Sequence, residues 1–188
     1  MGMLENKVAI ITGATGGIGF SMAEEFAKEG ADIVVVGTNA ERGQKAVDAV
    51  TAIGKKAFFR KTDLTSTADL QGLVDDTMKE FGRIDILVNN AGADDPISWI
   101  PADVTEEEDD RVMAVNTKAP FFLSQKVAPI MKVQGGGAII NTASIASTGA
   151  GRAGDPKEIA RVAVFLASDD ASYLHGAEIC PDGGFTLI

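Results

Sequence analysis

The sequence predicts a single α/β domain over residues 1–188, in which helices cover both faces of a doubly wound parallel sheet. Short apolar runs rich in Val and Ile recur along the chain, and segments of helical spacing separate them. Continuous runs of this kind are typical of strands buried on both faces, as parallel strands are. The alternation of strand and helix then favours a three-layer α/β/α arrangement with right-handed crossovers.

The first half of the chain contains four predicted strands and three predicted helices. The strands are expected at 8–11, 32–36, 56–61 and 84–88. The helices are expected from the glycine-rich turn to Gly30, over 40–53 before Gly54, and from Ser66 to Phe81 before Gly82. Glycine after a helix suits the left-handed residue that closes it, and serine before one caps its free N–H groups.

The second half is less regular. A loop is expected at 94–101 and a long helix at 105–133, in which Pro120 and Pro129 predict a kink or a break. The side chains expected on the buried side of this helix are Val112, Val115, Phe122, Val127 and Ile130. A fifth strand is expected at 138–141, a loop at 145–150, a helix after Pro156, and a last strand near 178–181.

Composition narrows the range of functions. The formal net charge of −10 and the pI near 4.5 argue against a nucleic-acid-binding surface, which would need a basic face. The apolar runs are shorter than the ~20 residues of a membrane-spanning helix, and the single cysteine, Cys180, suits a reducing compartment. Because the N-terminus shows no signal-peptide pattern, we expect a cytoplasmic protein without nucleic-acid or membrane partners.

An acidic cluster lies in the middle of the chain. Six acidic residues fall within the eight positions from Asp103 to Asp110. We interpret them as a solvated helix face and as negative charge at a helix N-terminus, where it is favourable. No His or Cys lies near them to add ligands, so no metal site is predicted.

The glycine-rich turn after the first strand is the main functional signal. Gly13, Gly17 and Gly19 follow that strand and lead into a helix. Glycine lets a ligand approach the main chain, and the free N–H groups and positive dipole end of a helix suit a pyrophosphate. The alternative is a tight turn that binds nothing, because glycine-rich turns are common.

Further motifs follow in order along the chain. They are Thr12-Gly13-Ala14-Thr15-Gly16-Gly17-Ile18-Gly19, Asp63-Leu64, Asn89-Asn90-Ala91-Gly92, Asn116, Ser144, Gly154-Asp155-Pro156, Phe165-Leu166-Ala167-Ser168-Asp169 and Asp182-Gly183-Gly184. With these motifs the chain resembles the short-chain dehydrogenase/reductase family over nearly its whole length. The resemblance implies a Rossmann-like fold, a homodimer or homotetramer, and an NAD(P)-dependent oxidoreductase that transfers a hydride between nicotinamide and a carbonyl or alcohol substrate.

The resemblance also implies the residues of the site. The coenzyme would contact Gly13, Thr15, Gly16, Gly17, Ile18, Gly19, Asp63, Leu64, Asn90, Ala91 and Gly92. Asp63 would accept the adenine amino group, although an Asp at a strand end can also simply stabilise a turn. Ser144 would hydrogen-bond the substrate oxygen, and Asn116 would distort its helix and hold a water of the proton relay.

The choice of coenzyme depends on the turn after the second strand. An acidic side chain there would bind the ribose 2′-hydroxyl of NAD. The chain has Gly37, Thr38 and Asn39 instead, and Arg42 follows on the next helix. Nothing in this turn repels a 2′-phosphate, so we expect NADP rather than NAD, with Thr38, Asn39 and Arg42 as contacts. The alternative for Arg42 is a solvated helix residue.

The catalytic pair of the family is absent from its expected place. The resemblance implies a Tyr and, four residues later, a Lys whose ammonium lowers the tyrosine pKa. Those positions hold Lys157 and Arg161, which belong to the following helix. The only tyrosine, Tyr173, is followed four residues later by Ala177, and we expect it to pack near the C-terminal strand. The only histidine, His175, is expected at the surface.

The break in the pattern falls between Ala150 and Gly151. Roughly 50 or more residues of the family pattern are missing there, comparable to a βα unit and a lid. Either the molecule contains this segment and the sequence lacks it, or the chain is truly shortened. The first account predicts an active oxidoreductase and the second a non-catalytic NAD(P)-binding protein. A lost strand would leave the last strand unpaired, which favours the first account.

Overall fold

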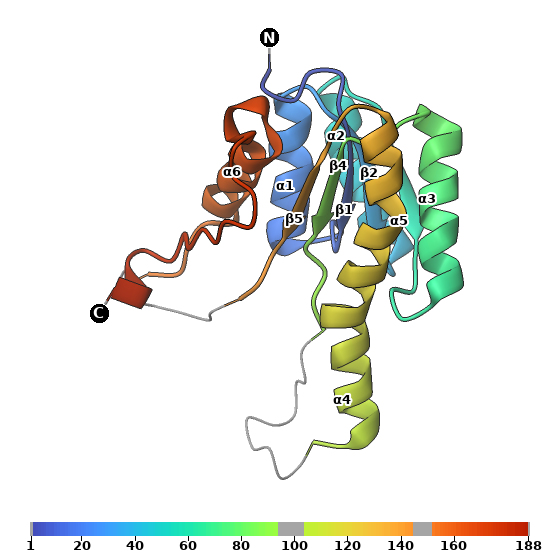
Figure 1. Ribbon diagram of the computed structural model, residues 1–188, viewed down its shortest axis with the longest axis vertical. Coiled ribbons are helices and arrows are strands. Elements are labelled where there is room, and N and C mark those ends of the chain that lie inside the picture. The colour runs from blue at the N-terminus through green and yellow to red at the C-terminus, as the bar shows by residue number, and fades with distance from the viewer. Residues whose placement is uncertain (1, 94–103, 145–151, 188) are drawn as a thin grey trace.

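The computed structural model describes residues 2–93, 104–144 and 152–187, which form a five-stranded parallel sheet between two layers of helices (Figure 1). The strands are β1 Val8–Thr12, β2 Asp32–Gly37, β3 Ala57–Lys61, β4 Ile86–Asn89 and β5 Ala138–Asn141. Their order in the sheet is β3-β2-β1-β4-β5, which reverses between β1 and β4 as in doubly wound folds. The predicted fold class is therefore confirmed. The loops expected at 94–101 and 145–150 lie outside the described residues.

The helices divide between the two faces of the sheet. They are α1 Gly17–Lys28, α2 Ala40–Ala52, α3 Thr67–Phe81, α4 Glu106–Met113, the π-helical segment η2 Ala114–Lys118, α5 Ala119–Val133 and α6 Pro156–Ala167, with short 3-10 turns at Asp169–Ala171 and Phe185–Leu187. Helices α1, α2 and α6 pack on one face, and α3 and α5 cover the other (Figure 1). The alternation expected in the first half of the chain is confirmed.

The central strands are buried on both sides. In β1, Ala9 and Ile11 belong to the core beneath α1 and α6, whereas Ile10 belongs to the core beneath α3 and α5. Successive side chains of a strand point to opposite faces, so a strand covered on both faces must be apolar throughout. This explains why β1 reads as one continuous apolar run.

Local signals set the helix ends as expected. The Ser66 hydroxyl accepts a hydrogen bond from the first turn of α3 (3.2 Å), and Gly82 closes that helix with a φ of 74°. At α6, Asp155 and Glu158 form a capping box. The bidentate ion pair with Arg152 (2.7 and 2.8 Å), together with the N–H of Asp155, lowers the pKa of Glu158 to about 2.

The long helix expected at 105–133 is interrupted. The π-helical segment separates α4 from α5, and Pro120 lies in the first turn of α5, so the regular helix changes near Pro120. Pro129 lies inside α5, which continues to Val133, so no break occurs there. The fully buried positions are Ala119, Leu123, Val127 and Met131. Val127 is as predicted, but four other predicted core positions are only half-buried: Val112, Val115, Phe122 and Ile130.

The acidic cluster forms the start of α4. Thr105 and Glu108 make a capping box, and the helix buries no residue. The acids described there lie toward solvent, as expected. Within the described part of the chain, no group of His, Cys, Asp or Glu could hold a metal ion. In the same residues, no helix has the length and apolar character needed to cross a bilayer.

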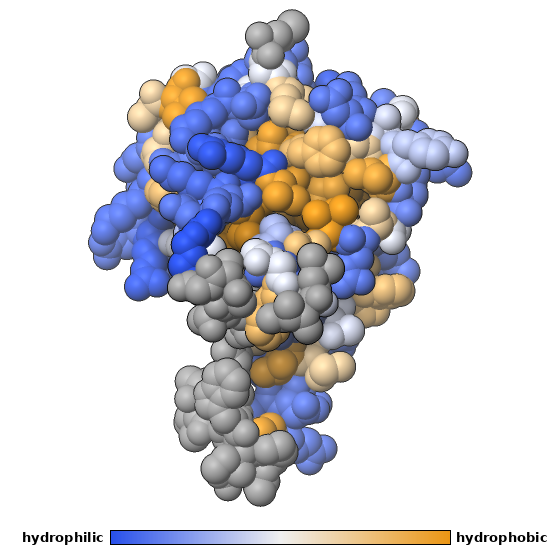
Figure 2. Space-filling model, turned by 90° about the vertical axis from the view of Figure 1, so that its left-hand side faces the viewer, coloured by the Kyte–Doolittle hydropathy of each residue, from blue (hydrophilic) through white to orange (hydrophobic). Residues whose placement is uncertain are grey.

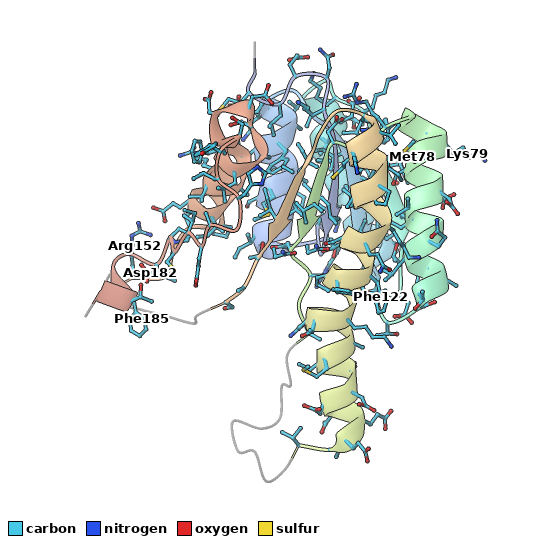
Figure 3. All side chains as sticks on the ribbon, in the orientation of Figure 1. Met78, Lys79, Phe122, Arg152, Asp182 and Phe185 are labelled. Carbon is cyan, nitrogen blue, oxygen red and sulfur yellow. The ribbon has the colours of Figure 1, made fainter. Side chains whose placement is uncertain are left out.

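The C-terminal residues differ from the prediction. Residues 178–181 form no strand and are exposed, and Tyr173 is 98% exposed rather than packed. Among the described strands β5 is the last on its side of the sheet, and residues 178–181 do not pair with its open edge. Asp182 instead accepts hydrogen bonds within a local turn, and Figure 3 shows Asp182 and Phe185 away from the sheet. His175 is exposed, as expected.

Candidate functional site

The glycine-rich turn fits closely against the loop that follows β4. Gly13 has a φ of +68°, and a Cβ built there would lie 2.9 Å from the Cα of Ala91. A Cβ at Gly19 would lie 2.3 Å from the carbonyl oxygen of Gly13 and 2.6 Å from the Asn90 carboxamide nitrogen. Contacts this short exclude a side chain at either position. These two glycines therefore let the turn, the start of α1 and the β4 loop meet.

The N-terminus of α1 has no side-chain cap. Gly16 stands at the cap position in an extended conformation, and no side chain in the described part of the chain caps the helix. Four other helices are capped by a side chain: α2 by Asn39, α3 by Ser66, α4 by Thr105 and α6 by Asp155. A Cβ at Gly16 or Gly17 would meet nothing within 4 Å. Free N–H groups at a dipole end with open space before them suit an anion such as a pyrophosphate.

Thr12 joins the ends of β1 and β4. Its hydroxyl accepts hydrogen bonds from the main-chain N–H groups of Asn90 (2.9 Å) and Ala91 (3.0 Å) and donates to the carbonyl of Val88 (3.2 Å). The Asn90 carboxamide donates to the carbonyl of Thr12 (3.0 Å). Thr12 is 2% exposed. The sequence analysis includes Thr12 in the glycine-rich motif but predicts no function for it. Its position between a strand and a glycine-rich turn could have indicated that it joins the two strand ends.

The turn after β2 lies beside the glycine-rich turn. A Cβ at Gly37 would lie 2.4 Å from the methyl carbon of Thr15, so the two turns touch. Thr38, Asn39 and Arg42 are exposed, and the Asn39 side chain accepts the N–H of Arg42 (2.9 Å). No carboxylate belongs to 37–39, and the acid that begins α2, Glu41, pairs with Lys45 at 2.8 Å. The charge at this turn is compatible with a bound phosphate.

Asp63 lies in the turn after β3. Its carboxylate accepts hydrogen bonds from the hydroxyl (2.7 Å) and the N–H (2.9 Å) of Thr65, and these bonds lower the pKa of Asp63. Both bonds use the same carboxylate oxygen, Oδ1. The side chain is exposed, and Leu64 beside it is half-buried. Asp63 therefore stabilises the turn while staying ionised at neutral pH, and the structure allows it a second role as an acceptor.

Asn116 lies in the π-helical segment and contacts the loop after β4. Its side-chain oxygen accepts the N–H of Ala93 (2.7 Å), and its side-chain nitrogen donates to the carbonyl of Ala93 (2.8 Å). The helix distortion expected at this residue is present, because Ala114–Lys118 is π-helical. Such single π-helical turns are frequent at functional sites.

A groove of about 1240 Å³ opens between the β4 loop, α5 and β5. Of the predicted site residues, it brings together Ile18, Asn90, Ala91, Gly92, Asn116 and Ser144. Those at the ends of β2 and β3 lie outside it: Thr38, Asn39, Arg42, Asp63 and Leu64. The side chain at its floor, Asn89, is 4% exposed and donates to the side chains of Asn141 (2.9 Å) and Ser124 (3.3 Å). The sequence did not predict this polar floor.

The groove also has exposed apolar side chains in its lining. Phe121 of α5 and Ile139 of β5 line it and are 63% and 36% exposed. Figure 2 shows an apolar area, bordered by hydrophilic surface, on the face of the molecule seen from the side of α6. None of the described residues that line the groove carries an ionisable side chain. The groove as described can position a substrate, but it offers no proton donor with a side chain that titrates.

Comparison with known protein families gives two matches. The short chain dehydrogenase family model matches residues 7–155. A model described as Enoyl-(Acyl carrier protein) reductase matches residues 147–186. Together they cover both sides of the break that the sequence motifs indicate.

Similar proteins have been named as oxidoreductases. The uncharacterized oxidoreductase YxbG of Bacillus subtilis is 31% identical, over 98% of this chain and 92% of that protein. A 3alpha-hydroxysteroid dehydrogenase of Mediterraneibacter gnavus is 30% identical, over 96% and 97%. The solved structure of a 7 alpha-hydroxysteroid dehydrogenase, complexed with NADH and 7-oxo glycochenodeoxycholic acid, has a TM-score of 0.87 at 30% identity and covers 96% of this chain and 94% of that one.

The alignment with the Bacillus protein is longer than this chain. It runs over 257 positions, whereas the chain has 188 residues, so at least 69 positions (257 less 188) hold no residue of this chain.

Proposed function

The chain belongs to the short-chain dehydrogenase family and is an NAD(P)-dependent oxidoreductase, and we propose that it uses NADP to interconvert a ring alcohol and its ketone. The observation that carries the coenzyme part is the uncapped N-terminus of α1, with open space beside Gly16 and Gly17. Main-chain N–H groups there can bind phosphate oxygens without a side chain in the way.

The proposed coenzyme contacts follow the carboxyl ends of the strands. The main chain of 13–19, with Thr15 and Ile18, would hold the pyrophosphate. Asp63 and Leu64 would take the adenine, and residues 90–92 the nicotinamide. When bound, the nicotinamide ring accepts or supplies the hydride. The side chains and main chain of the protein bind and orient the two reactants.

The proposed preference for NADP depends on the turn after β2. The Thr38 hydroxyl, the first N–H groups of α2 and the Arg42 guanidinium would contact the 2′-phosphate. The absence of an acid from 37–39 and the pairing of Glu41 with Lys45 support this choice. A phosphate gains from charge-assisted hydrogen bonds that a ribose hydroxyl cannot make.

The proposed substrate is an apolar ring alcohol or ketone. Two of the similar proteins are named as hydroxysteroid dehydrogenases. The apolar wall formed by Phe121 and Ile139 suits such a ring, and Ser144 at the mouth of the groove would hydrogen-bond the reacting oxygen. Asn116 would support the proton relay. In the oxidation, the carbon loses a hydride and its hydroxyl loses a proton.

The proton donor is proposed to lie in a segment between Ala150 and Gly151. The described groove lining contains no ionisable side chain, and at least 69 positions of the Bacillus alignment hold no residue of this chain. On this proposal, residues 1–188 and the segment form one domain. From the resemblance we also propose a cytoplasmic homodimer or homotetramer, which light scattering of the purified protein and cell fractionation would test.

Three measurements test these proposals. Calorimetric titration with NADPH and NADH should show binding of both, with NADPH tighter. Intact mass of the protein isolated from its natural source should exceed 19.6 kDa, and that protein should oxidise NADPH with a ring ketone. A mass of 19.6 kDa with tight binding and no turnover would favour a non-catalytic NAD(P)-binding protein. No binding of either coenzyme would overturn the proposed site.

A further inference from the structure

A lysine at the end of β3 lies beside the turn after β2. Lys61 is the last residue of β3, and in the register of the sheet it lies opposite Gly37, the last residue of β2. The N–H of Thr62 donates to the carbonyl of Gly37 at 3.1 Å, so the two main chains stay together to the very end of both strands. The side chain of Lys61 therefore starts next to the turn where the proposed site would hold the 2′-position of the coenzyme.

The side chain of Lys61 belongs to the face of the sheet that α2 covers. Phe59 packs against the core on this face, and a Cβ at Gly43 of α2 would lie 2.2 Å from the Phe59 ring. Arg60 instead pairs with Asp76 of α3, on the other face, at 2.7 Å. Because side chains alternate along a strand, Lys61 shares the face of Phe59. It lies beyond Phe59 toward the carboxyl edge of the sheet, where α2 begins.

Two cations at this edge have no carboxylate partner among the described residues. Arg42 and Lys61 are both exposed, and neither side chain forms an ion pair within those parts of the chain. Glu41 pairs with Lys45 at 2.8 Å, and Asp63 accepts hydrogen bonds within its own turn. The strand β3 is also at the opposite edge of the sheet from β5, after which the break in the family pattern falls. A phosphate that enters here meets positive charge without displacing an ion pair of the described residues.

The turn after β2 supplies no positive charge of its own. Residues 37–39 are Gly, Thr and Asn, and the Asn39 side chain already accepts the N–H of Arg42 at 2.9 Å. A neutral turn can bind a ribose hydroxyl, whereas a phosphate gains most from charged donors. A lysine ammonium is a compact charge on a flexible stem, so it can follow a phosphate oxygen without a fixed geometry. Selection of the phosphate therefore depends on cations from neighbouring elements.

We propose that Lys61 is a specificity-determining residue, which together with Arg42 binds the 2′-phosphate of NADP and so selects it over NAD. The two cations come from different elements, Lys61 from the end of β3 and Arg42 from the first turn of α2. NAD presents only a hydroxyl at this position and gains little from either charge. Lys61 lies outside the family motifs, and its role rests on the proposed coenzyme site.

Calorimetric titration of the purified protein and its variants tests the role of Lys61. Lys61→Met keeps an unbranched side chain but loses the charge, so it should weaken NADPH binding about three- to fivefold, as for an exposed charged contact, and leave NADH binding unchanged. Lys61→Arg should keep the preference for NADPH. Lys56→Met is the matched control, because it removes an exposed lysine just before β3, at the other end of that strand. The double variant Arg42→Ala/Lys61→Met should lose most of the preference.

Phosphorus NMR of bound NADPH gives a readout that does not depend on affinity. In the complex with the unaltered protein, the two cations should hold the pKa of the 2′-phosphate below its value in free NADPH, because positive charge favours the dianion. Lys61→Met should raise that pKa part of the way back, whereas Lys56→Met should leave it where it is. A purely structural role for Lys61 would not move this pKa.

The outcomes separate the role of Lys61 from the proposed function. If Lys61→Met weakens NADPH and NADH equally, weakens NADPH no more than Lys56→Met does, or leaves the 2′-phosphate pKa unchanged, the role of Lys61 is overturned and the coenzyme site stands. Equal binding of NADH and NADPH by the unaltered protein overturns the proposed preference and the role of Lys61 with it. Failure of both coenzymes to bind overturns the proposed coenzyme site as well.

Discussion

Thr12 and Asn90 bond to each other twice. The Thr12 hydroxyl accepts the main-chain N–H of Asn90 at 2.9 Å, and the Asn90 carboxamide donates to the Thr12 carbonyl at 3.0 Å. Between them these bonds fix the exits of β1 and β4, the strands on either side of the point where the strand order reverses. Ligands of open α/β sheets bind at such a point.

Replacement of Thr12 by valine should destabilise the protein. The change keeps the shape of the side chain but leaves the N–H groups of Asn90 and Ala91 without their acceptor. An unsatisfied buried donor costs about 1–3 kcal/mol, and these two N–H groups are half-buried, so urea unfolding should show a loss of roughly 1–3 kcal/mol. Thr12→Ser keeps the hydroxyl and is the matched control. Equal stabilities of the two variants would show that the hydroxyl bonds contribute little.

Alanine at Gly19 and at Gly16 should have different effects. The Cβ at Gly19 would lie 2.3 Å from a carbonyl oxygen, so Gly19→Ala should lower the melting temperature and weaken NADPH binding more than tenfold. The Cβ at Gly16 has open space and an extended backbone, so Gly16→Ala should keep the melting temperature. If Gly16→Ala nevertheless weakens NADPH binding, the coenzyme approaches the main chain there. The expectation fails if both variants melt like the unaltered protein.

Arg42 should distinguish the two coenzymes. Arg42→Ala should weaken NADPH binding by about five- to tenfold, a typical loss for an exposed charged contact, and leave NADH binding unchanged. The loss should shrink at high salt because ions screen exposed charges. Lys79→Ala, on α3 at the opposite face of the sheet, is the control for a lost positive charge. Equal losses for NADPH and NADH would contradict a contact with the 2′-phosphate.

The ion pair at the start of α6 should make stability depend on pH. Arg152 and the N–H of Asp155 lower the pKa of Glu158 from 4.5 to about 2, so the folded state favours the carboxylate. The stabilisation is present above pH 4.5 and is lost as the pH falls toward 2. Glu158→Gln should therefore melt below the unaltered protein at pH 7, with a smaller difference at pH 3. Glu80→Gln controls for the loss of one negative charge, and a difference that does not change with pH would contradict this account.

Elements with local signals could be predicted from the sequence. Ser66 and Gly82 mark the ends of α3 because a hydroxyl acceptor and a left-handed residue act within one turn of the chain. The central strands could also be predicted, because each is a short continuous apolar run. The same reasoning failed for 178–181, because a strand depends on a neighbour that its own sequence does not specify.

The candidate site likewise has features that the sequence predicts and features that only the structure shows. The glycine spacing placed the turn before α1, and the Asn116 helix was expected to be distorted. A role for Asn89 or Asn90 in tying loops together could be read from the sequence, but their partners could not. The bonds from Asn116 to Ala93 were not predicted either. Thr12 and Asn90 are 78 residues apart, so no window of sequence contains both partners.

The sequence by itself determined the alternation of strands and helices, the glycine-rich turn and the missing Tyr and Lys, since each depends on residues that are close together in the chain. Only the tertiary structure decided which face of α5 is buried, what the Asn116 side chain contacts, and that residues 178–181 form no strand. Those outcomes depend on hydrogen-bond partners and packing surfaces that distant segments supply. The hydrophobic periodicity of a segment is visible in its own sequence, whereas long-range contacts form only when distant segments come together in the folded sheet.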